Sequence, residues 1–388
     1  MRRTCLTAAL LGGVALLAAP SAHAASWTDQ GVSDPTGATA SGLSGVACVT
    51  ATTCLATGRW DDISSGPISL GAEWSGASWS LQPPATPAGA LSDELAGISC
   101  VAVRDCTAVG TYDTGAGPSP HVQTWTGGWA IETAPRPAGA TSAQLVGISC
   151  STGGACTAVG VYTDAGGTYG LAMRRSGGTW SLQATPSPTG ATMTSLAGVS
   201  CDASENCTAV GTVIGGGGVP EPVVISRSGG TGTWTVEPTP MPAGGASFLS
   251  GVSCDASGGC TAVGVETDAR TGDAVPLAMF RSSGRWTLSA TPPLPPGAQG
   301  GMLSGVSCTA SAADCTAVGL SYDSGFVVSP LAEDLSGTTW SEAAPPLPSG
   351  STSGQLVGVS CSASLECTAT GSHVDANGDL RALIDRYE

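Results

Sequence analysis

The sequence contains no lysine and few histidines, and both shortages exclude mechanisms. Without lysine there is no P-loop lysine, no Schiff-base chemistry and no Ser–Lys dyad. The three histidines are His23, His121 and His373, and His23 lies in a segment that we expect to be removed. A multi-histidine metal site or a histidine-based catalytic triad is therefore not expected, and no cofactor is indicated.

Basic side chains are also scarce, which makes the chain strongly acidic. Arg2 and Arg3 are two of its 13 basic residues, so residues 25–388 would carry 11 basic against 29 acidic residues, a formal net charge of −18. Such a surface repels a phosphate backbone, and nucleic acid is therefore not expected as a partner.

Residues 1–24 have the pattern of a secretory signal peptide. Two arginines precede an apolar run over residues 6–19, and Ala22-His23-Ala24 places small residues before the expected cleavage site. An uncleaved membrane anchor is the alternative, but the run is short for a bilayer span of ~20 residues. We therefore expect a secreted, extracellular protein with no membrane span after signal cleavage, in which residues 25–388 form a single monomeric domain.

Three motifs recur along the rest of the chain, each seven times at intervals of 50 to 54 residues. The first resembles Leu-x-Gly-Val-Ser-Cys and the second Cys-Thr-Ala-Val-Gly. The third is a tryptophan that follows a turn rich in glycine and serine, at Trp27, Trp79, Trp129, Trp180, Trp234, Trp286 and Trp340. Repetition at this period is typical of propellers and solenoids.

Each repeat has the pattern of four short strands. In one copy these are residues 249–254, 260–264, 276–281 and 285–290, separated by Gly, Ser, Asp and Pro clusters without helical periodicity. The fold class predicted is all-β: a seven-bladed β-propeller with four antiparallel strands per blade. A parallel β-helix is the alternative, but it needs a shorter period.

The phase of the repeat predicts how the ring closes. Trp27 precedes the first Leu-x-Gly motif, and the last repeat ends at Glu388 after its third strand without a tryptophan. The N-terminal strand around Trp27 should therefore complete the last blade by pairing with residues 382–387, which leaves no open sheet edge.

Fourteen cysteines follow the signal peptide, two in each repeat. They lie at the ends of adjacent strands joined by a short turn, where opposed residues are close enough for a disulfide. A metal site would need closer spacing, such as Cys-x-x-Cys. The predicted bridges are Cys48–Cys54, Cys100–Cys106, Cys150–Cys156, Cys201–Cys207, Cys254–Cys260, Cys308–Cys315 and Cys361–Cys367.

These cysteine-bearing repeats resemble those of secreted, cysteine-paired propeller proteins of high-GC Gram-positive bacteria, over essentially the whole mature chain. The turn before several tryptophans also resembles the Asp-box of sialidase-like propellers, Ser-x-Asp-x-Gly-x-x-Trp. The glycine–tryptophan end is kept in Gly76-Ala-Ser-Trp79, Gly177-Gly-Thr-Trp180 and Gly337-Thr-Thr-Trp340. The Asp position holds Trp74, Arg175 and Leu335, so the box is degenerate and sialidase activity is not implied.

The candidate binding residues follow the second strand of the first three repeats. They are Trp60, Asp61, Tyr112, Asp113, Tyr162 and Asp164. Aromatic faces beside carboxylates suit sugar rings, which offer C–H patches for stacking and hydroxyls for hydrogen bonds. Later repeats carry Glu266, Ser321 and His373 at the aromatic position, so the aromatic surface is one-sided. The alternative is structural: Asp and Gly form hairpin turns, and the aromatic ring covers a strand end.

No carboxylate pair departs from the repeat enough to be assigned catalysis. Arg175, Arg227, Arg281 and Arg386 recur at one repeat position and have a structural interpretation. The segment Asp375–Asp379 resembles a calcium loop, although an Asn-Gly hairpin turn explains it as well. We therefore expect a secreted, non-catalytic module that binds a glycan or an extracellular protein. The alternatives are a sialidase-like hydrolase or lyase, and a purely structural extracellular module.

Overall fold

The structure, a computed structural model, describes residues 26–62, 66–243, 245–309, 311–363 and 366–388, so the predicted signal peptide lies outside it. These residues form strands and turns without a helix, and none of them forms a helix that could cross a membrane. The strands make five sheets of four strands and one of eight. The eight-stranded sheet consists of two four-stranded units joined by the single parallel pair Thr168–Met193. The prediction of an all-β fold built from four-stranded antiparallel sheets is confirmed.

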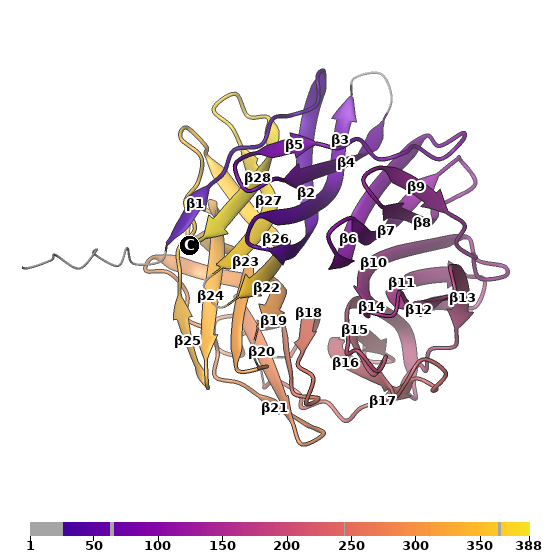
Figure 1. Ribbon diagram of the computed structural model, residues 1–388. Coiled ribbons are helices and arrows are strands. Elements are labelled where there is room, and N and C mark those ends of the chain that lie inside the picture. The colour runs from indigo at the N-terminus through magenta and orange to yellow at the C-terminus, as the bar shows by residue number, and fades with distance from the viewer. Residues whose placement is uncertain (1–25, 63–65, 244, 310, 364–365) are drawn as a thin grey trace, which may run out of the picture.

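Each four-stranded unit contains one copy of the repeat, and the units stand around a common axis with their first strands innermost (Figure 1). We number them unit 1 (β2–β5), unit 2 (β6–β9), unit 3 (β10–β13), unit 4 (β14–β17), unit 5 (β18–β21), unit 6 (β22–β25) and unit 7 (β26–β28 with β1). The first strands are β2 (Ala38–Thr50), β6 (Ser92–Ala102), β10 (Ser142–Cys150), β14 (Ala191–Cys201), β18 (Ser247–Cys254), β22 (Ala298–Cys308) and β26 (Ser353–Ala363). The second strands are β3 (Thr53–Asp62), β7 (Asp105–Asp113), β11 (Cys156–Asp164), β15 (Cys207–Gly215), β19 (Cys260–Thr267), β23 (Asp314–Asp323) and β27 (Glu366–Val374).

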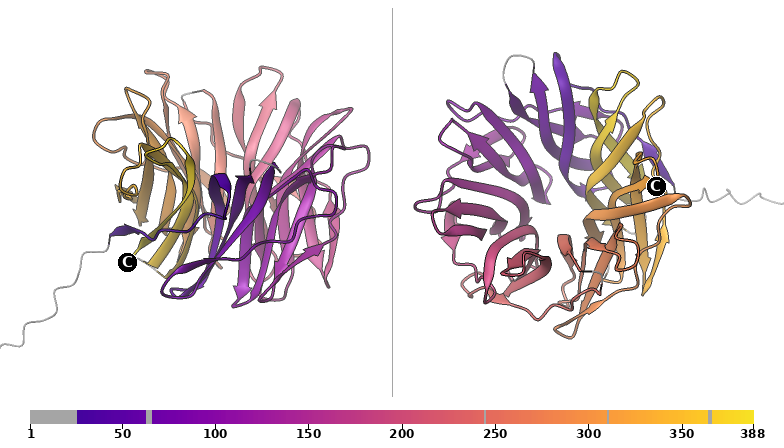
Figure 2. Two further views of the ribbon diagram at one scale, coloured as in Figure 1. Left: turned by 90° about the horizontal axis from the view of Figure 1, so that it is seen from above. Right: turned by 180° about the vertical axis from the view of Figure 1, so that it is seen from behind.

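The third and fourth strands form the outer half of each unit. The third strands are β4 (Pro67–Trp74), β8 (Ser119–Trp125), β12 (Gly167–Ser176), β16 (Pro220–Arg227), β20 (Ala274–Ser282), β24 (Val328–Ser336) and β28 (Leu380–Tyr387). The fourth strands are β5 (Trp79–Leu81), β9 (Trp129–Glu132), β13 (Thr179–Gln183), β17 (Thr235–Val236), β21 (Arg285–Leu288), β25 (Thr339–Glu342) and, in unit 7, β1 (Trp27–Asp29). The strand β1 pairs with β28 in the register Trp27–Tyr387, so the first and last strands of the chain share one sheet (Figure 2).

Two glycines in every repeat lie where one stretch of backbone approaches another closely. A β-carbon on the first-strand glycine, such as Gly45, would lie 2.6–3.2 Å from a carbonyl oxygen of the neighbouring unit's first strand. The same contact recurs from unit to unit, including Gly358 of unit 7 against Ser44 of unit 1. A β-carbon on the second-strand glycine, such as Gly58, would lie 1.9–2.1 Å from a carbonyl oxygen of the adjacent first strand, where a register shift accommodates one extra residue.

The predicted disulfides all form, each between the first and second strands of one unit. Within each bridge the two Cα atoms are 3.9–4.1 Å apart, and the cysteines are opposed in the strand register. The bridges therefore close short turns within units and make no covalent link between one unit and the next.

Seven apolar clusters hold the units together, and each combines side chains of two neighbouring units. The cluster around Trp79, for example, joins Leu43 of unit 1 to Ile384 of unit 7. The repeat tryptophans are buried against these clusters apart from Trp129, which is half-buried, so they are packing residues of the outer strands.

In several units an arginine near the end of the third strand also bonds to the preceding unit. Arg175 forms a two-pronged ion pair with Glu132 of the preceding unit, which also accepts a hydrogen bond from the Trp180 indole at 2.8 Å. The structural interpretation of this position is therefore supported. Arg386 does not belong to the set, because it pairs with Thr368 and Tyr387 stands opposite Cys367 in unit 7.

A serine before the first cysteine links neighbouring first strands. Its hydroxyl accepts a hydrogen bond from the first cysteine's N–H in the next unit, at 2.9–3.1 Å. The six donor–acceptor pairs are Cys48–Ser360, Cys150–Ser99, Cys201–Ser149, Cys254–Ser200, Cys308–Ser253 and Cys361–Ser307. Unit 1 carries Ala47 at this position, so its methyl group faces Cys100 of unit 2 without an acceptor.

This exception gives a stability prediction. Replacing Ala47 with serine should supply the missing acceptor and raise the free energy of unfolding by about 1 kcal/mol. Urea denaturation of the parent and the Ala47→Ser variant measures the change.

The matched control is Ser149→Ala, which removes the acceptor of Cys201 at the joint between units 3 and 4. It should lower the free energy of unfolding by about 1 kcal/mol or more. If Ala47→Ser destabilises the protein, the joint between units 1 and 2 has no room for the hydroxyl and the expectation is wrong.

Candidate functional site

The six residues nominated from the sequence lie at equivalent places, where the second strands of units 1–3 lead into their hairpin turns. Trp60 and Asp61 lie near the end of β3, Tyr112 and Asp113 end β7, and Tyr162 and Asp164 lie at the end of β11.

The three aromatic rings pack on their own units and keep part of their surface exposed. Trp60 packs against the cluster between units 7 and 1, and Tyr162 lies 5.3 Å from the ring of Tyr169. Tyr112 contacts the ring of His121 edge-on at 5.9 Å. These contacts support the structural interpretation in part, because each ring covers a strand end. All three side chains nevertheless remain partly exposed.

Two of the three aspartates are used within hairpin turns. Asp113 accepts hydrogen bonds from the N–H groups of Gly115 and Gly117 at 2.7 and 3.1 Å. Asp164 accepts one from Gly166 at 2.7 Å. Asp61 differs, because its buried Oδ1 atom makes no hydrogen bond among the described residues.

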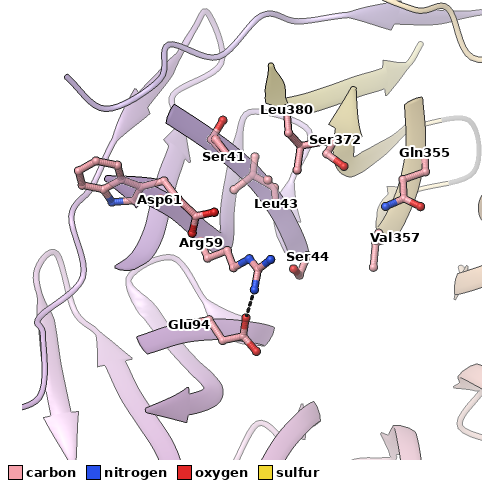
Figure 3. A pocket seen from close by; sticks show the side chains of 13 residues that line it. Ser41, Leu43, Ser44, Arg59, Asp61, Glu94, Gln355, Val357, Ser372 and Leu380 are labelled. Carbon is pink, nitrogen blue, oxygen red and sulfur yellow. Dashed lines mark hydrogen bonds and ion pairs between the residues drawn. The ribbon is translucent and has the colours of Figure 1, made fainter. Parts of the chain in front are cut away.

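Asp61 lines a hollow of about 250 Å³ at the first strands of units 7, 1 and 2. Figure 3 shows its wall: Arg59 extends toward Glu94 of unit 2, while Gln355 of unit 7 faces them from the opposite side. The guanidinium Nη1 of Arg59 lies 3.4 Å from a carboxylate oxygen of Glu94, and both side chains are about half exposed. Such an exposed pair contributes little to stability, so both groups are free to exchange partners with a ligand.

A second hollow of about 190 Å³ adjoins the first and shares Arg59 and Glu94 with it. Its wall includes Asp93, which is 3% exposed and accepts hydrogen bonds from the backbone N–H and the hydroxyl of Ser69. Burial raises the pKa of Asp93, and the bonds from Ser69 oppose that rise. The two hollows together form a polar surface over units 7, 1 and 2 that reaches Gln144 of unit 3.

Of the residues nominated from the sequence, Trp60, Asp61 and Asp113 line this surface, whereas Arg59, Glu94 and Gln355 were missed. A signal was available for Arg59, because it breaks the repeat. The residue after the second-strand glycine in the other units is uncharged, namely Thr111, Val161, Thr212, Val265, Leu320 and Ser372. Glu94 and Gln355 share a position that varies too much between repeats to be noticed.

Beneath Tyr112, His121 is held in its neutral form. Its Nε2 atom lies 3.0 Å from the side-chain nitrogen of Gln123, which can only donate, so Nε2 accepts. Burial lowers the pKa of His121 to about 4, and the imidazole therefore stays uncharged at neutral pH. At 1% exposure it supports the Tyr112 ring and has no access to a ligand.

Two carboxyl groups with strongly raised pKa values lie elsewhere, inside the sheets. Glu333 and Asp385 are fully buried, and neither makes a side-chain hydrogen bond within the described part of the chain. Burial is the main cause that raises each pKa to about 8. They occupy the third-strand position held by Met173 and Met279 in units 3 and 5, so they are core residues and do not face the hollows.

The calcium-like segment forms a hairpin turn. Asp375 accepts hydrogen bonds from the N–H groups of Asn377 and Asp379, and Arg381 lies within ion-pair distance of both aspartates. Within the described ranges no group of three or more His, Cys, Asp or Glu side chains is arranged to hold a metal ion.

No family model and no curated protein sequence matches this chain. Several solved structures are similar in fold. YCF48 from Cyanidioschyzon merolae aligns with a TM-score of 0.53 at 11% identity, over 94% of this chain and 99% of that one. An ulvan lyase of a polysaccharide lyase family gives 0.55 at 10% identity, over 89% and 94%. The polysaccharide lyase Uly1 gives 0.52 at 9% identity, over 90% and 89%. At these identities the likeness shows a propeller-like fold and nothing about activity.

The buried Glu333 gives a prediction about pH. In the folded protein the pKa of the Glu333 carboxyl group is about 8, so the group stays protonated below that pH. In the unfolded chain its pKa is near 4.5. The unfolded state therefore binds fewer protons between these values, and stability falls as pH rises through that window. Replacing Glu333 with methionine should remove this contribution, so the variant gains more stability at pH 8.5 than at pH 4.5.

Thermal unfolding at the two pH values measures the effect. Glu221→Met, at an exposed position of β16, is the matched control and should change both values equally. A Glu333→Met variant with an unchanged pH dependence would show that the carboxyl group is ionised in the fold.

Proposed function

We propose that the seven units form a closed, seven-bladed β-propeller in which β1 completes unit 7. Two contacts between units 7 and 1 support closure, because they repeat those at other joints. The Cys48 N–H donates to the Ser360 hydroxyl at 2.9 Å, and Gly358 packs on the Ser44 carbonyl. Closure also accounts for the position of Trp27, which contributes to the apolar cluster between units 6 and 7.

Deleting residues 25–32 tests closure. The deletion would remove β1 and expose the edge of β28, so the protein should aggregate or lose much of its thermal stability. Size-exclusion chromatography with light scattering and thermal unfolding measure this, with the chain that begins at residue 25 as control. A truncated protein that stays monomeric and equally stable would contradict the closed ring.

We further propose that the protein is exported as a single extracellular domain. Seven disulfides persist only in an oxidising compartment, which agrees with the signal-peptide pattern of residues 1–24. The shared fold of two polysaccharide lyases makes a glycan the favoured ligand class over a protein.

The function that the geometry supports best is non-catalytic glycan binding at the hollow of about 250 Å³ lined by units 7, 1 and 2, which we call the axial hollow. One observation carries the proposal: Arg59, a charged side chain that breaks the repeat, meets Glu94 and Gln355 of the two neighbouring units on this one sector. Arg59, Asp61, Glu94 and Gln355 offer donors and acceptors for hydroxyl groups, beside the half-exposed ring of Trp60. A purely structural module gives no reason for this sector to depart from the other units.

A glycan-processing enzyme is the second candidate, and the fold shared with polysaccharide lyases is the observation in its favour. The carboxylates argue against the hydrolase form of this candidate. Glycoside hydrolysis needs two carboxyl groups in complementary protonation states, but Asp113 and Asp164 are held by turn N–H groups. Asp93 is the acid in these hollows whose pKa is raised, and Ser69 occupies its carboxylate. Incubating the purified protein with glycans that it retains, and looking for shortened or unsaturated products, separates the two candidates.

A glycan array on the purified mature protein, followed by variants, tests the binding site. The double substitution Trp60→Ala and Tyr112→Ala should weaken glycan retention about tenfold or more, because stacking contacts are lost. The melting temperature should fall because both rings cover strand ends, but the variant should stay folded, since both rings are only partly buried. Glu266→Ala, at the same place in unit 5, is the matched control and should bind like the parent.

Two outcomes count against the site. If the double variant binds as well as the parent, the glycan binds elsewhere. If it unfolds, the aromatic rings serve packing alone. A parent protein that retains no glycan on the array would favour the structural-module alternative.

A further inference from the structure

The hairpin turn of unit 6 contains a side chain that its fold does not require. In unit 7 the turn is fixed by Asp375, whose carbonyl accepts a hydrogen bond from the Gly378 N–H at 3.1 Å. In unit 6 Asp323 plays the same part, and its carbonyl accepts from the Phe326 N–H at 3.0 Å. Both aspartate carboxylates also accept from the N–H groups two and four residues later. The two turns are therefore equivalent, and Phe326 stands where unit 7 has glycine.

This position disfavours phenylalanine in two ways. Its φ angle is +60°, in the left-handed region that glycine adopts without strain, and Gly378 has a φ of +87°. Unit 4 likewise uses a glycine, Gly218, at φ +74°. The Phe326 side chain is 75% exposed, so burial does not offset the strain. Backbone strain that packing does not repay is concentrated at functional sites.

The ring of Phe326 lies in a defined orientation. It stacks on Tyr322, with ring centroids 5.9 Å apart and an interplanar angle of 14°. The Tyr322 hydroxyl is itself fixed, because it accepts a hydrogen bond from the Ala274 N–H at 3.2 Å. The stacked pair therefore forms a rigid aromatic platform whose outer ring faces solvent.

A hollow of about 360 Å³ adjoins this platform. Its wall contains Tyr322 and the carboxylate-bearing Asp323 and Glu342. It also contains prolines from the loop before β22, from β24 and from the segment after β25. The hollow is within the size range of small-ligand sites and combines an aromatic face with hydrogen-bond acceptors.

We propose that Phe326, Tyr322 and the adjoining hollow form a second carbohydrate site, in which an uncharged pyranose ring stacks on Phe326. Glu342, in the wall of the hollow, offers carboxylate oxygens to sugar hydroxyls, and the two carboxylates disfavour an anionic sugar. The exposed apolar surface, Phe326 with Val327, is small beside the ~800 Å² that each partner buries in a stable protein interface, which favours a sugar over a protein. The site lies on unit 6, apart from the axial hollow, and does not depend on the function proposed for that hollow.

The test uses the residue that the equivalent turns already contain. Phe326→Gly should relieve the strained φ, so its melting temperature should be no lower than the parent's. Titrations with cellohexaose, chitohexaose, xylohexaose and mannohexaose, followed by saturation-transfer NMR and calorimetry, measure binding. For the oligosaccharide that the parent binds at this site, Phe326→Gly should weaken affinity about tenfold or more.

Two further variants keep the outcomes distinct. Phe326→Trp preserves an aromatic face and should retain binding, whereas Trp60→Ala with Tyr112→Ala alters the axial sector and should leave binding at Phe326 unchanged. The proposal is overturned if Phe326→Gly binds as the parent does, if it melts at a lower temperature, or if the parent binds none of the four probes at millimolar concentration.

Discussion

The close packing of the first strands around the axis is the constraint on which the rest of the molecule depends. Each first-strand glycine lies against a backbone carbonyl of the neighbouring unit, and a β-carbon there would come within 2.6–3.2 Å of its oxygen, so the two strands would have to shift. Because the innermost strands approach so closely, their large side chains must point between the sheets. Those side chains form the apolar clusters between units, and the tryptophans of the outer strands pack against the same clusters. A side chain at one of these glycines would push the two innermost strands apart at that point.

Most of the architecture could be predicted because the sequence repeats its local signals. The spacing of the two cysteine motifs set the adjacent strands and their bridges, and the early position of Trp27 predicted its pairing with the last strand. The register at the end of unit 7 was not predictable in the same way. Arg386 seemed equivalent to Arg175, but the strand pairing places Tyr387 there instead. A shift of one residue depends on the lengths of two hairpins, which composition does not fix.

The candidate site was only partly readable because it combines segments far apart in the chain. Arg59 and Gln355 are separated by most of the sequence, and they meet only because units 7 and 1 are neighbours in space. Departures from the repeat were the useful signal, both for the aromatic residues of units 1–3 and, in hindsight, for Arg59. Phe326 is the same kind of departure, although its meaning required the equivalent turn of unit 7 for comparison.

The placement of the disulfides has a consequence for how the protein matures. Fourteen cysteines can pair in very many ways, yet each native bridge joins partners only six or seven positions apart. Closing so short a segment is fast compared with contacts between distant repeats. Each hairpin can therefore form its native disulfide as soon as its two cysteines have been synthesised and exposed to an oxidant, before the following repeat is made. Oxidative folding should then proceed without extensive thiol–disulfide shuffling, and the correct bridges would be in place before the units have found their neighbours.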